Sequence, residues 1–284
     1  MANLNSIINS YPIQYGIEFN QTFTLNPTVT GNGSIGAGNK FTLSNQAGDP
    51  VWYSNIGPIG GAGSWLFPNT SSTDGTSVST VEANIPSTWA DGDYSLGFWV
   101  MSPDLAGTYF SPMPIINVGM SASGTTDVQL CIGKTGSDWK FIYSVDGGAT
   151  FAAFTPPISQ NVWYFVTIRK DLANSQITFT LDTQYSSTVT NTTTGTAWPI
   201  KIGAIGPLTL PDVYISNFYI APSSVIGPTQ QLQIYNAGIT PPRVVKYWNG
   251  SAWITSSDQK VYNGTAWVDW NAQRWAGGPN WVGV

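Results

Sequence analysis

Residues 163–183, WYFVTIRKDLANSQITFTLDT, contain two apolar runs separated by a short polar segment. Both runs, 163–170 and 176–183, are rich in β-branched and aromatic residues, which favour strands over helices. Asn174 and Ser175 lie between the runs and belong to the residue types that form turns. We therefore predict two antiparallel strands joined by a polar turn.

Further segments of the same kind lie along the chain and are separated by Gly, Pro, Asn, Asp or Ser. They cover residues 94–101, 115–120, 128–133, 139–145, 200–205 and 213–221. We find no window of eleven or more residues with clean helical spacing of its apolar residues. Many short strands at such spacing predict an all-β fold in which two antiparallel sheets pack face to face.

The order of these segments resembles that of the concanavalin A-like and laminin-G-like jelly rolls. In this family a strand of the type YSLGFWV (94–100) is followed by one of the type NVWYFVTIRKD (161–171), which leads into ITFTLDTQ (177–184). The end of the domain in the family is similar to residues 199–225. The resemblance covers about residues 15–225 and implies a jelly-roll sandwich.

The composition limits the partners of the chain. Charged residues make up 9% of its 284 residues, against about 25% in typical proteins, and the net charge is -5. Without a basic stripe, nucleic acid is a poor partner, and no apolar run is long enough for membrane insertion. The N-terminus lacks the pattern of a secretory signal, and Cys131 is the single cysteine. We expect the chain to fold in a cytoplasm with Cys131 in its core.

Three similar segments follow one another at the C-terminus: KYWNGSAWI from Lys246, KVYNGTAWV from Lys260 and RWAGGPNWV from Arg274. Their starts are 14 residues apart, which predicts three copies of one small unit. Asn-Gly between apolar runs indicates a hairpin with a two-residue turn. Such a turn would place a cation opposite a Trp in every copy, in the pairs Lys246–Trp253, Lys260–Trp267 and Arg274–Trp281.

These patterns divide the chain into an N-terminal arm (1–14), the jelly roll (15–228), a proline-containing linker (229–243) and three aromatic hairpin repeats (244–284). Six of the 13 Trp residues lie in the repeats, and two interpretations remain open. The indoles form a small satellite core, or they stack against sugars. The candidate carbohydrate-binding residues are Tyr247, Trp248, Trp253, Tyr262, Trp267, Trp270, Trp275 and Trp281.

The sequence offers little catalytic chemistry. It has no histidine, which removes the commonest general base and most zinc sites. Glycosidases of this fold class need paired carboxylates, but neither Glu18 nor Glu82 has an acid two positions away. We interpret Asp91 and Asp93, which precede a strong strand, as turn residues. We therefore predict no enzyme and no cofactor. We find no dense acidic loop that would supply Ca²⁺ ligands, so we name no metal ligands and leave a calcium site open.

The C-terminal repeats resemble the short tandem repeats that end some minor tail and fibre proteins of tailed bacteriophages. With the sandwich pattern and the missing signal, this likeness predicts a virion protein: a tail-fibre, minor tail or head-decoration component with host-surface glycans as its candidate ligand. Other virion proteins and further copies of the chain, by analogy a trimer, are the expected partners. A purely structural role in a shell or fibre, without sugar binding, is the alternative, and a polysaccharide depolymerase is a third, less favoured one.

Overall fold

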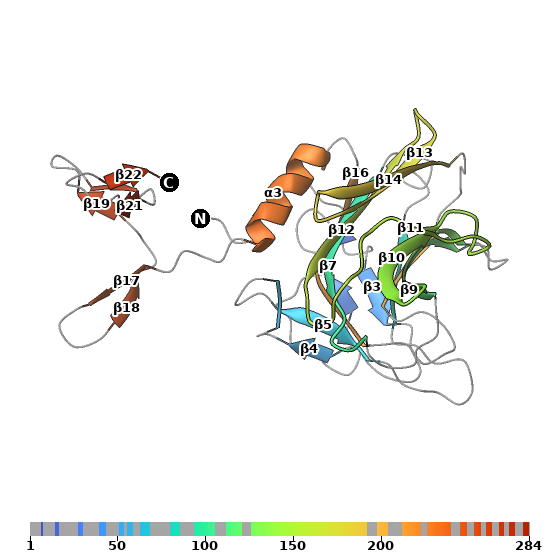
Figure 1. Cartoon of the computed structure of the whole chain (residues 1–284), viewed down its shortest axis with the longest axis horizontal. Coiled ribbons are helices and arrows are strands. Elements are labelled where there is room, and N and C mark those ends of the chain that lie inside the picture. The colour runs from blue at the N-terminus through green and yellow to red at the C-terminus, as the bar shows by residue number, and fades with distance from the viewer. Residues whose placement is uncertain are drawn as a thin grey trace. The chain divides into compact units, whose positions relative to one another are not determined.

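A computed structural model gives the fold of the chain (Figure 1), which divides into two compact units, Ala2–Pro241 and Pro242–Val284. The structure describes residues 7, 15–16, 28–30, 40–43, 51–53, 56–58, 63–68, 80–85, 94–105, 112–120, 126–191, 198–203, 212–222, 226–239, 245–248, 253–256, 260–262, 267–269, 273–275 and 281–283. No helix in these ranges is long and apolar enough to cross a membrane.

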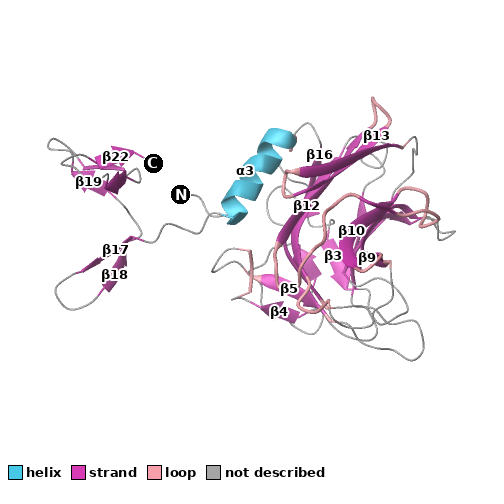
Figure 2. Ribbon diagram, in the orientation of Figure 1, coloured by secondary structure: helices cyan, strands magenta, loops and turns pink. Residues whose placement is uncertain are grey.

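The larger unit is a sandwich of two antiparallel sheets (Figure 2). The first sheet has the order β14 (Tyr185–Thr190), β13 (Gln176–Leu181), β12 (Tyr164–Asp171), β7 (Tyr94–Met101), β16 (Val213–Pro222), β5 (Ser64–Phe67) and β4 (Val51–Tyr53), with β1 (Tyr15–Gly16) beside β16. The second has the order β11 (Ala152–Ala153), β10 (Asp138–Ser144), β9 (Thr126–Thr135), β8 (Met113–Met120), β15 (Trp198–Gly203), β6 (Thr80–Ile85), β3 (Lys40–Leu43) and β2 (Thr28–Thr30). Strands distant in sequence become neighbours in both sheets, and the predicted all-β, jelly-roll-like sandwich is confirmed.

The strand pair predicted from residues 163–183 is β12 and β13. Its last paired residues are Asp171 and Gln176, so the turn includes the expected Asn174 and Ser175. The Asp171 carboxylate accepts hydrogen bonds from the backbone N–H (3.0 Å) and side-chain Nδ2 (2.8 Å) of Asn174. Ser175 takes a positive φ of 51°, and its N–H donates to the Leu172 carbonyl at 3.0 Å. Local polar chemistry therefore closes this hairpin.

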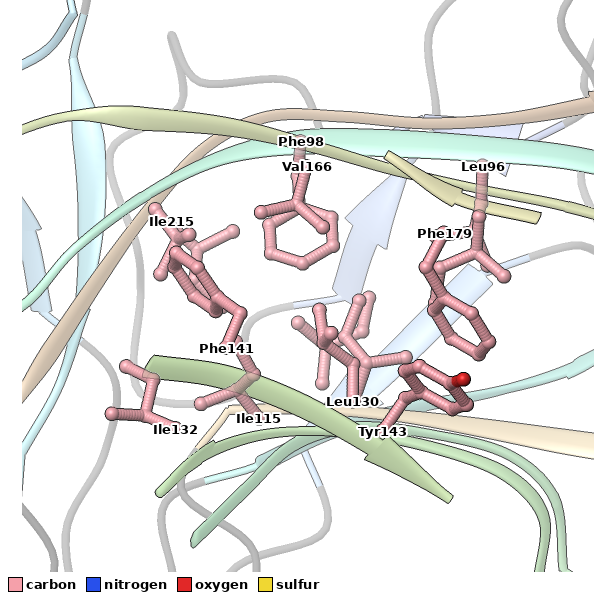
Figure 3. Close-up of a cluster of buried hydrophobic side chains, with 14 of the residues drawn as sticks. Leu96, Phe98, Ile115, Leu130, Ile132, Phe141, Tyr143, Val166, Phe179 and Ile215 are labelled. Carbon is pink, nitrogen blue, oxygen red and sulfur yellow. The ribbon is translucent and has the colours of Figure 1, made fainter. Parts of the chain in front are cut away.

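The main core lies between the two sheets (Figure 3). Alternate residues of the central strands enter it, such as Leu96 and Phe98 of β7 and Leu130 of β9. Tyr143 of β10 stacks on Phe179 of β13 with ring centroids 4.2 Å apart. This contact joins the two sheets because the strands belong to opposite layers.

Cys131 is buried, as predicted for the single cysteine. Burial raises the pKa of its thiol far above the ordinary value because the thiolate would lose its hydration. The thiol is therefore held in its unreactive, protonated form while the protein is folded.

A second, smaller core covers the other face of the first sheet. The sheet contributes Trp99, Phe165 and Tyr219 to this core. Helix α3 (Pro228–Ile239) packs over them, and Figure 1 shows it beside β12 and β16. The ring of Trp99 stacks on that of Tyr235 at 5.8 Å with an interplanar angle of 8°. The helix is therefore part of the sandwich unit.

Helix α3 corrects the expectation of a linker over residues 229–243. Residues 228–239 show no helical pattern in the sequence because the buried positions of the helix are Gln231, Ile234 and Gly238, of which only one is a large apolar residue. Gln231 is buried as a hydrogen-bonding group, since its Nε2 donates to Ser95 Oγ at 2.9 Å. Such a face leaves no apolar periodicity to detect.

The predicted N-terminal arm is described only at Ile7, which is helical and packs against the same second core. The rest of residues 1–14 lies outside the described residues.

We predict that Gly238→Ala destabilises the sandwich. A Cβ at this position would lie 1.9 Å from Cζ2 of Trp99, so the helix would have to move away from the sheet. Overpacking of this kind costs about 1–3 kcal/mol, which offsets the gain of about 1 kcal/mol in helix propensity. Chemical denaturation should show a lower midpoint than for the exposed control Asn236→Ala. A midpoint equal to or above that of the control would contradict the close contact.

Candidate functional site

The described residues of the C-terminal unit form three two-stranded hairpins. They are β17 (Val245–Trp248) with β18 (Trp253–Ser256), β19 (Lys260–Tyr262) with β20 (Trp267–Asp269), and β21 (Gln273–Trp275) with β22 (Trp281–Gly283). Each of the three predicted repeats is therefore one hairpin. An isolated two-stranded hairpin is marginally stable in water, so these units need further contacts.

The predicted pairing of cations with Trp residues is wrong. Four residues, not two, connect the strands of the first and second hairpins, and five connect those of the third, so every opposed pair differs from the prediction. Lys246 opposes Thr255, Lys260 opposes Asp269 and Arg274 opposes Val282. The longer connection instead allows aromatic residues to oppose each other, which is a favourable kind of cross-strand pair.

Every hairpin has an opposed aromatic pair at the end of the ladder next to its connecting loop. The pairs are Trp248–Trp253, Tyr262–Trp267 and Trp275–Trp281. Directly opposed residues share one face of a two-stranded ribbon, because side-chain direction alternates along both strands. The structure thus brings six of the eight candidate residues together as three pairs.

The remaining two candidates are not in these pairs. Tyr247 precedes Trp248 and opposes Ile254, which places it on the other face of its ribbon. Trp270 lies outside the described residues. Tyr247 therefore differs from Trp248 in position while belonging to the same hairpin.

An opposed aromatic pair suits the recognition of a sugar ring. Aromatic residues offer wide apolar area together with a polar N–H or O–H group, and binding sites combine such surfaces with a few polar groups. The same pair also suits packing against another protein surface. The chain repeats this arrangement three times at nearly equal spacing.

A second surface, which the sequence did not predict, lies on the outer face of the first sheet beyond α3. It carries Thr178, Thr180, Ser186, Thr188 and Thr190, and we call it the hydroxyl face. The Oγ1 atoms of Thr178 and Thr188 lie 3.0 Å apart, in hydrogen-bond contact across the two strands. Its signal in the sequence is the alternation of Thr with apolar residues along residues 176–181, whose apolar members face the core.

Two charged residues border the hydroxyl face. Arg169 opposes Thr178 in the β12–β13 ladder, and Asp171 lies two residues further along β12. Hydrogen bonds from Asn174, helped by the nearby charge of Arg169, hold the pKa of the Asp171 carboxyl below its ordinary value. The face is therefore polar and close to neutral overall.

The carboxylates of Asp146 and Asp182 serve local structure. Asp146 accepts hydrogen bonds from Ser144 Oγ (2.7 Å) and from the Thr150 N–H (3.0 Å) and Oγ1 (2.5 Å). The bonds from Thr150 and Ser144 lower the pKa of Asp146 to about 2. Asp182 has a raised pKa because it is partly buried, and it accepts the Phe165 N–H at 2.8 Å.

No group of three or more potential metal ligands occurs among the residues that the structure describes. Of the acids weighed from the sequence, Glu82 lies in β6, whereas Glu18, Asp91 and Asp93 lie outside the described residues.

The sandwich is similar to solved structures of other proteins. The binding domain of botulinum neurotoxin DC, in complex with SialylT, matches with a TM-score of 0.54 and 14% identity over 90% of this chain and 56% of that chain. The botulinum neurotoxin type G receptor-binding domain matches with a TM-score of 0.52 and 14% identity, over 92% of this chain and 66% of that chain. A Trypanosoma rangeli sialidase in complex with 2,3-difluorosialic acid matches with a TM-score of 0.50 and 13% identity, over 79% of this chain and 33% of that chain.

The match thus covers 56% of the length of the neurotoxin DC domain and 66% of the length of the type G domain. Identity this low shows a shared all-β fold and nothing further about the chain. No protein-family model matches the sequence, and no curated protein matches it.

We predict that engineered disulfides will report the register of the first hairpin. Val245→Cys combined with Ser256→Cys should form a disulfide on mild oxidation, because these residues are opposed. Opposed Cα atoms lie about 4.5–5.5 Å apart, within the reach of a disulfide.

The control for this experiment is Val245→Cys combined with Ile254→Cys, the pair that a two-residue turn would oppose. It should stay reduced, because diagonal neighbours are about 7–8 Å apart. Mass spectrometry separates the two states, and the buried Cys131 does not interfere. Preferential oxidation of the control pair would contradict the four-residue connection.

Proposed function

We propose that this protein is a surface component of a tailed-bacteriophage particle and that its C-terminal hairpins bind host-surface glycans. The observation that carries the glycan part is the opposed aromatic pair, which recurs in all three hairpins. A repeated pair at the same ladder position suits a repeated ligand. Polysaccharides of a cell surface are ligands of that kind.

The fold supports this proposal in a general way. Neighbours of the same fold include a binding domain solved in complex with SialylT and a receptor-binding domain. A sandwich with a mostly uncharged polar surface is compatible with recognition of hydroxyl-rich molecules. The phage part of the proposal rests on the likeness of the terminal repeats to those of tail and fibre proteins.

Three sites in series favour a polymeric ligand over a single sugar. Once one hairpin has bound, the others meet the same polymer at high effective concentration, and weak sites combine into strong attachment. This mode of binding needs no deep cavity and no catalytic group. The proposed role is accordingly attachment, without enzymatic activity, on a virion that also contains other structural proteins and further copies of this chain.

A purely structural role is the second candidate function. The opposed aromatic pairs would then form contacts between subunits of a shell or fibre, as marginal hairpins require. A wild-type protein that binds none of the tested glycans would favour this role over attachment.

We predict that Trp248→Ala weakens binding to the polysaccharide that wild-type protein selects on a glycan array. Truncating an aromatic anchor costs about 1–2 kcal/mol, which corresponds to a roughly 5–30-fold higher Kd in titration calorimetry or biolayer interferometry. Tyr247→Ala is the matched control, because it removes a neighbouring aromatic residue on the other face of the ribbon. We expect it to change the Kd less than about twofold. Equal losses in the two variants would contradict the role of the opposed pair.

We also predict that the chain is an integral part of purified phage particles. Quantitative mass spectrometry of particles banded by density should detect it in a fixed ratio to the other virion proteins. Its absence from intact particles, with the chain found only in infected-cell extract, would contradict the virion assignment and leave the glycan-binding prediction standing.

A further inference from the structure

The edge strands of the sandwich differ in length. Three strands at the ends of the two described sheets, β4, β11 and β2, contain only two or three residues. The fourth, β14, contains six residues. Short edges limit pairing with other chains, so among the described edge strands β14 has the greatest capacity for it.

The sequence of β14 lacks the features that prevent pairing. Residues 185–190, YSSTVT, contain no charged residue and no proline. The strand is regularly paired with β13 along its whole length, without a bulge. Tyr185 is 45% exposed, which is high for a large aromatic residue. Charges, prolines and bulges are among the features by which proteins protect long edges from pairing.

One hydrogen bond shows which backbone N–H and C=O groups of β14 point toward β13 and which point toward the edge of the sheet. The N–H of Asn191, directly after the strand, donates to the Ser175 carbonyl at 2.8 Å, on the side of β13. Backbone groups alternate in direction along an antiparallel strand. The N–H and C=O groups of Ser186, Thr188 and Thr190 therefore point away from β13, toward the edge of the sheet.

We propose that β14 pairs antiparallel with β14 of a second copy of this chain, around a two-fold axis at Ser187. This register places Ser186 opposite Thr188 of the second copy, and both residues have outward-pointing backbone groups that can form the hydrogen-bonded pairs. Tyr185 then opposes Val189 of the second copy in a non-hydrogen-bonded pair, where side chains approach most closely. By symmetry each of these contacts forms twice.

The chemistry of the strand favours a second copy as the partner. An aromatic residue opposite a β-branched one is a stabilising cross-strand pair, and here it covers the exposed ring of Tyr185. Val189 already packs, half-buried, against the main core, so the contact would extend that core across the axis. On the other face Ser186 and Thr188 pair hydroxyl with hydroxyl. No like charges meet, because the strand has none.

The proposed register also keeps the two faces of the sheet continuous from one copy to the other. A two-fold axis perpendicular to the sheet keeps core-facing residues opposite core-facing residues. The hydroxyl face of one copy would then continue into that of the second. This contact is two-fold and so differs from the trimer expected by analogy with phage fibres.

Sedimentation velocity of the full chain tests the proposal. Wild-type protein should show a concentration-dependent dimer. The double variant Ser186→Lys with Thr188→Lys introduces four ammonium groups around the axis and should raise the dimer dissociation constant at least about tenfold at low salt. The control is Gln176→Lys with Thr178→Lys, which adds the same charge to the same face one strand inward and should sediment like wild type.

A charge-reversal mixture makes the test specific to β14. Ser186→Glu with Thr188→Glu should weaken the dimer in the same way, but an equimolar mixture with the lysine variant should restore a dimer through opposite charges. Near-UV circular dichroism verifies that each variant is folded. A wild-type protein that is monomeric at all concentrations, or an oligomer whose mass the lysine pair leaves unchanged, overturns the proposal.

Discussion

The burial of β7 on both faces is the constraint on which the rest of the sandwich depends. Every residue of this central strand is buried. Leu96, Phe98 and Val100 enter the main core, and Trp99 enters the second core. One sheet can cover only one of these faces, so helix α3 has to cover the other. Gly97 fits the same constraint, since a Cβ there would lie 2.5 Å from Oη of Tyr219.

The sequence predicted the sandwich well because its signal is local. Strands such as residues 163–170 carry β-branched and aromatic residues at the required spacing, and the polar turn at Asn174 carries its own hydrogen-bonding chemistry. Helix α3 was missed because its contact with the sheet depends on Gly238, a residue without a side chain, and on the amide of Gln231. Neither residue produces an apolar period.

The candidate site was predicted only in part. The repeats indicated three hairpins, but the Asn-Gly dipeptides suggested two-residue turns and therefore the wrong opposed residues. The observed pairs, such as Trp248 with Trp253, depend on the length of the connection, which a dipeptide motif does not determine. The hydroxyl face was missed for a different reason: its residues come from two strands, and the pairing of β13 with β14 brings residues such as Thr178 and Thr188 side by side.

Helix α3 has a mechanical consequence. It is the last element before the hairpins in the chain, so a pulling force on the hairpins passes along the backbone into α3 before it reaches any strand. The contacts described between α3 and the sheet are side-chain contacts, such as the packing of Tyr235 on Trp99 and the hydrogen bond from Gln231 to Ser95, whereas the strands of the sheets are joined by ladders of backbone hydrogen bonds. Under a pulling force, α3 should therefore detach from the sheet first. This would lengthen the connection to the hairpins while the two sheets stay intact.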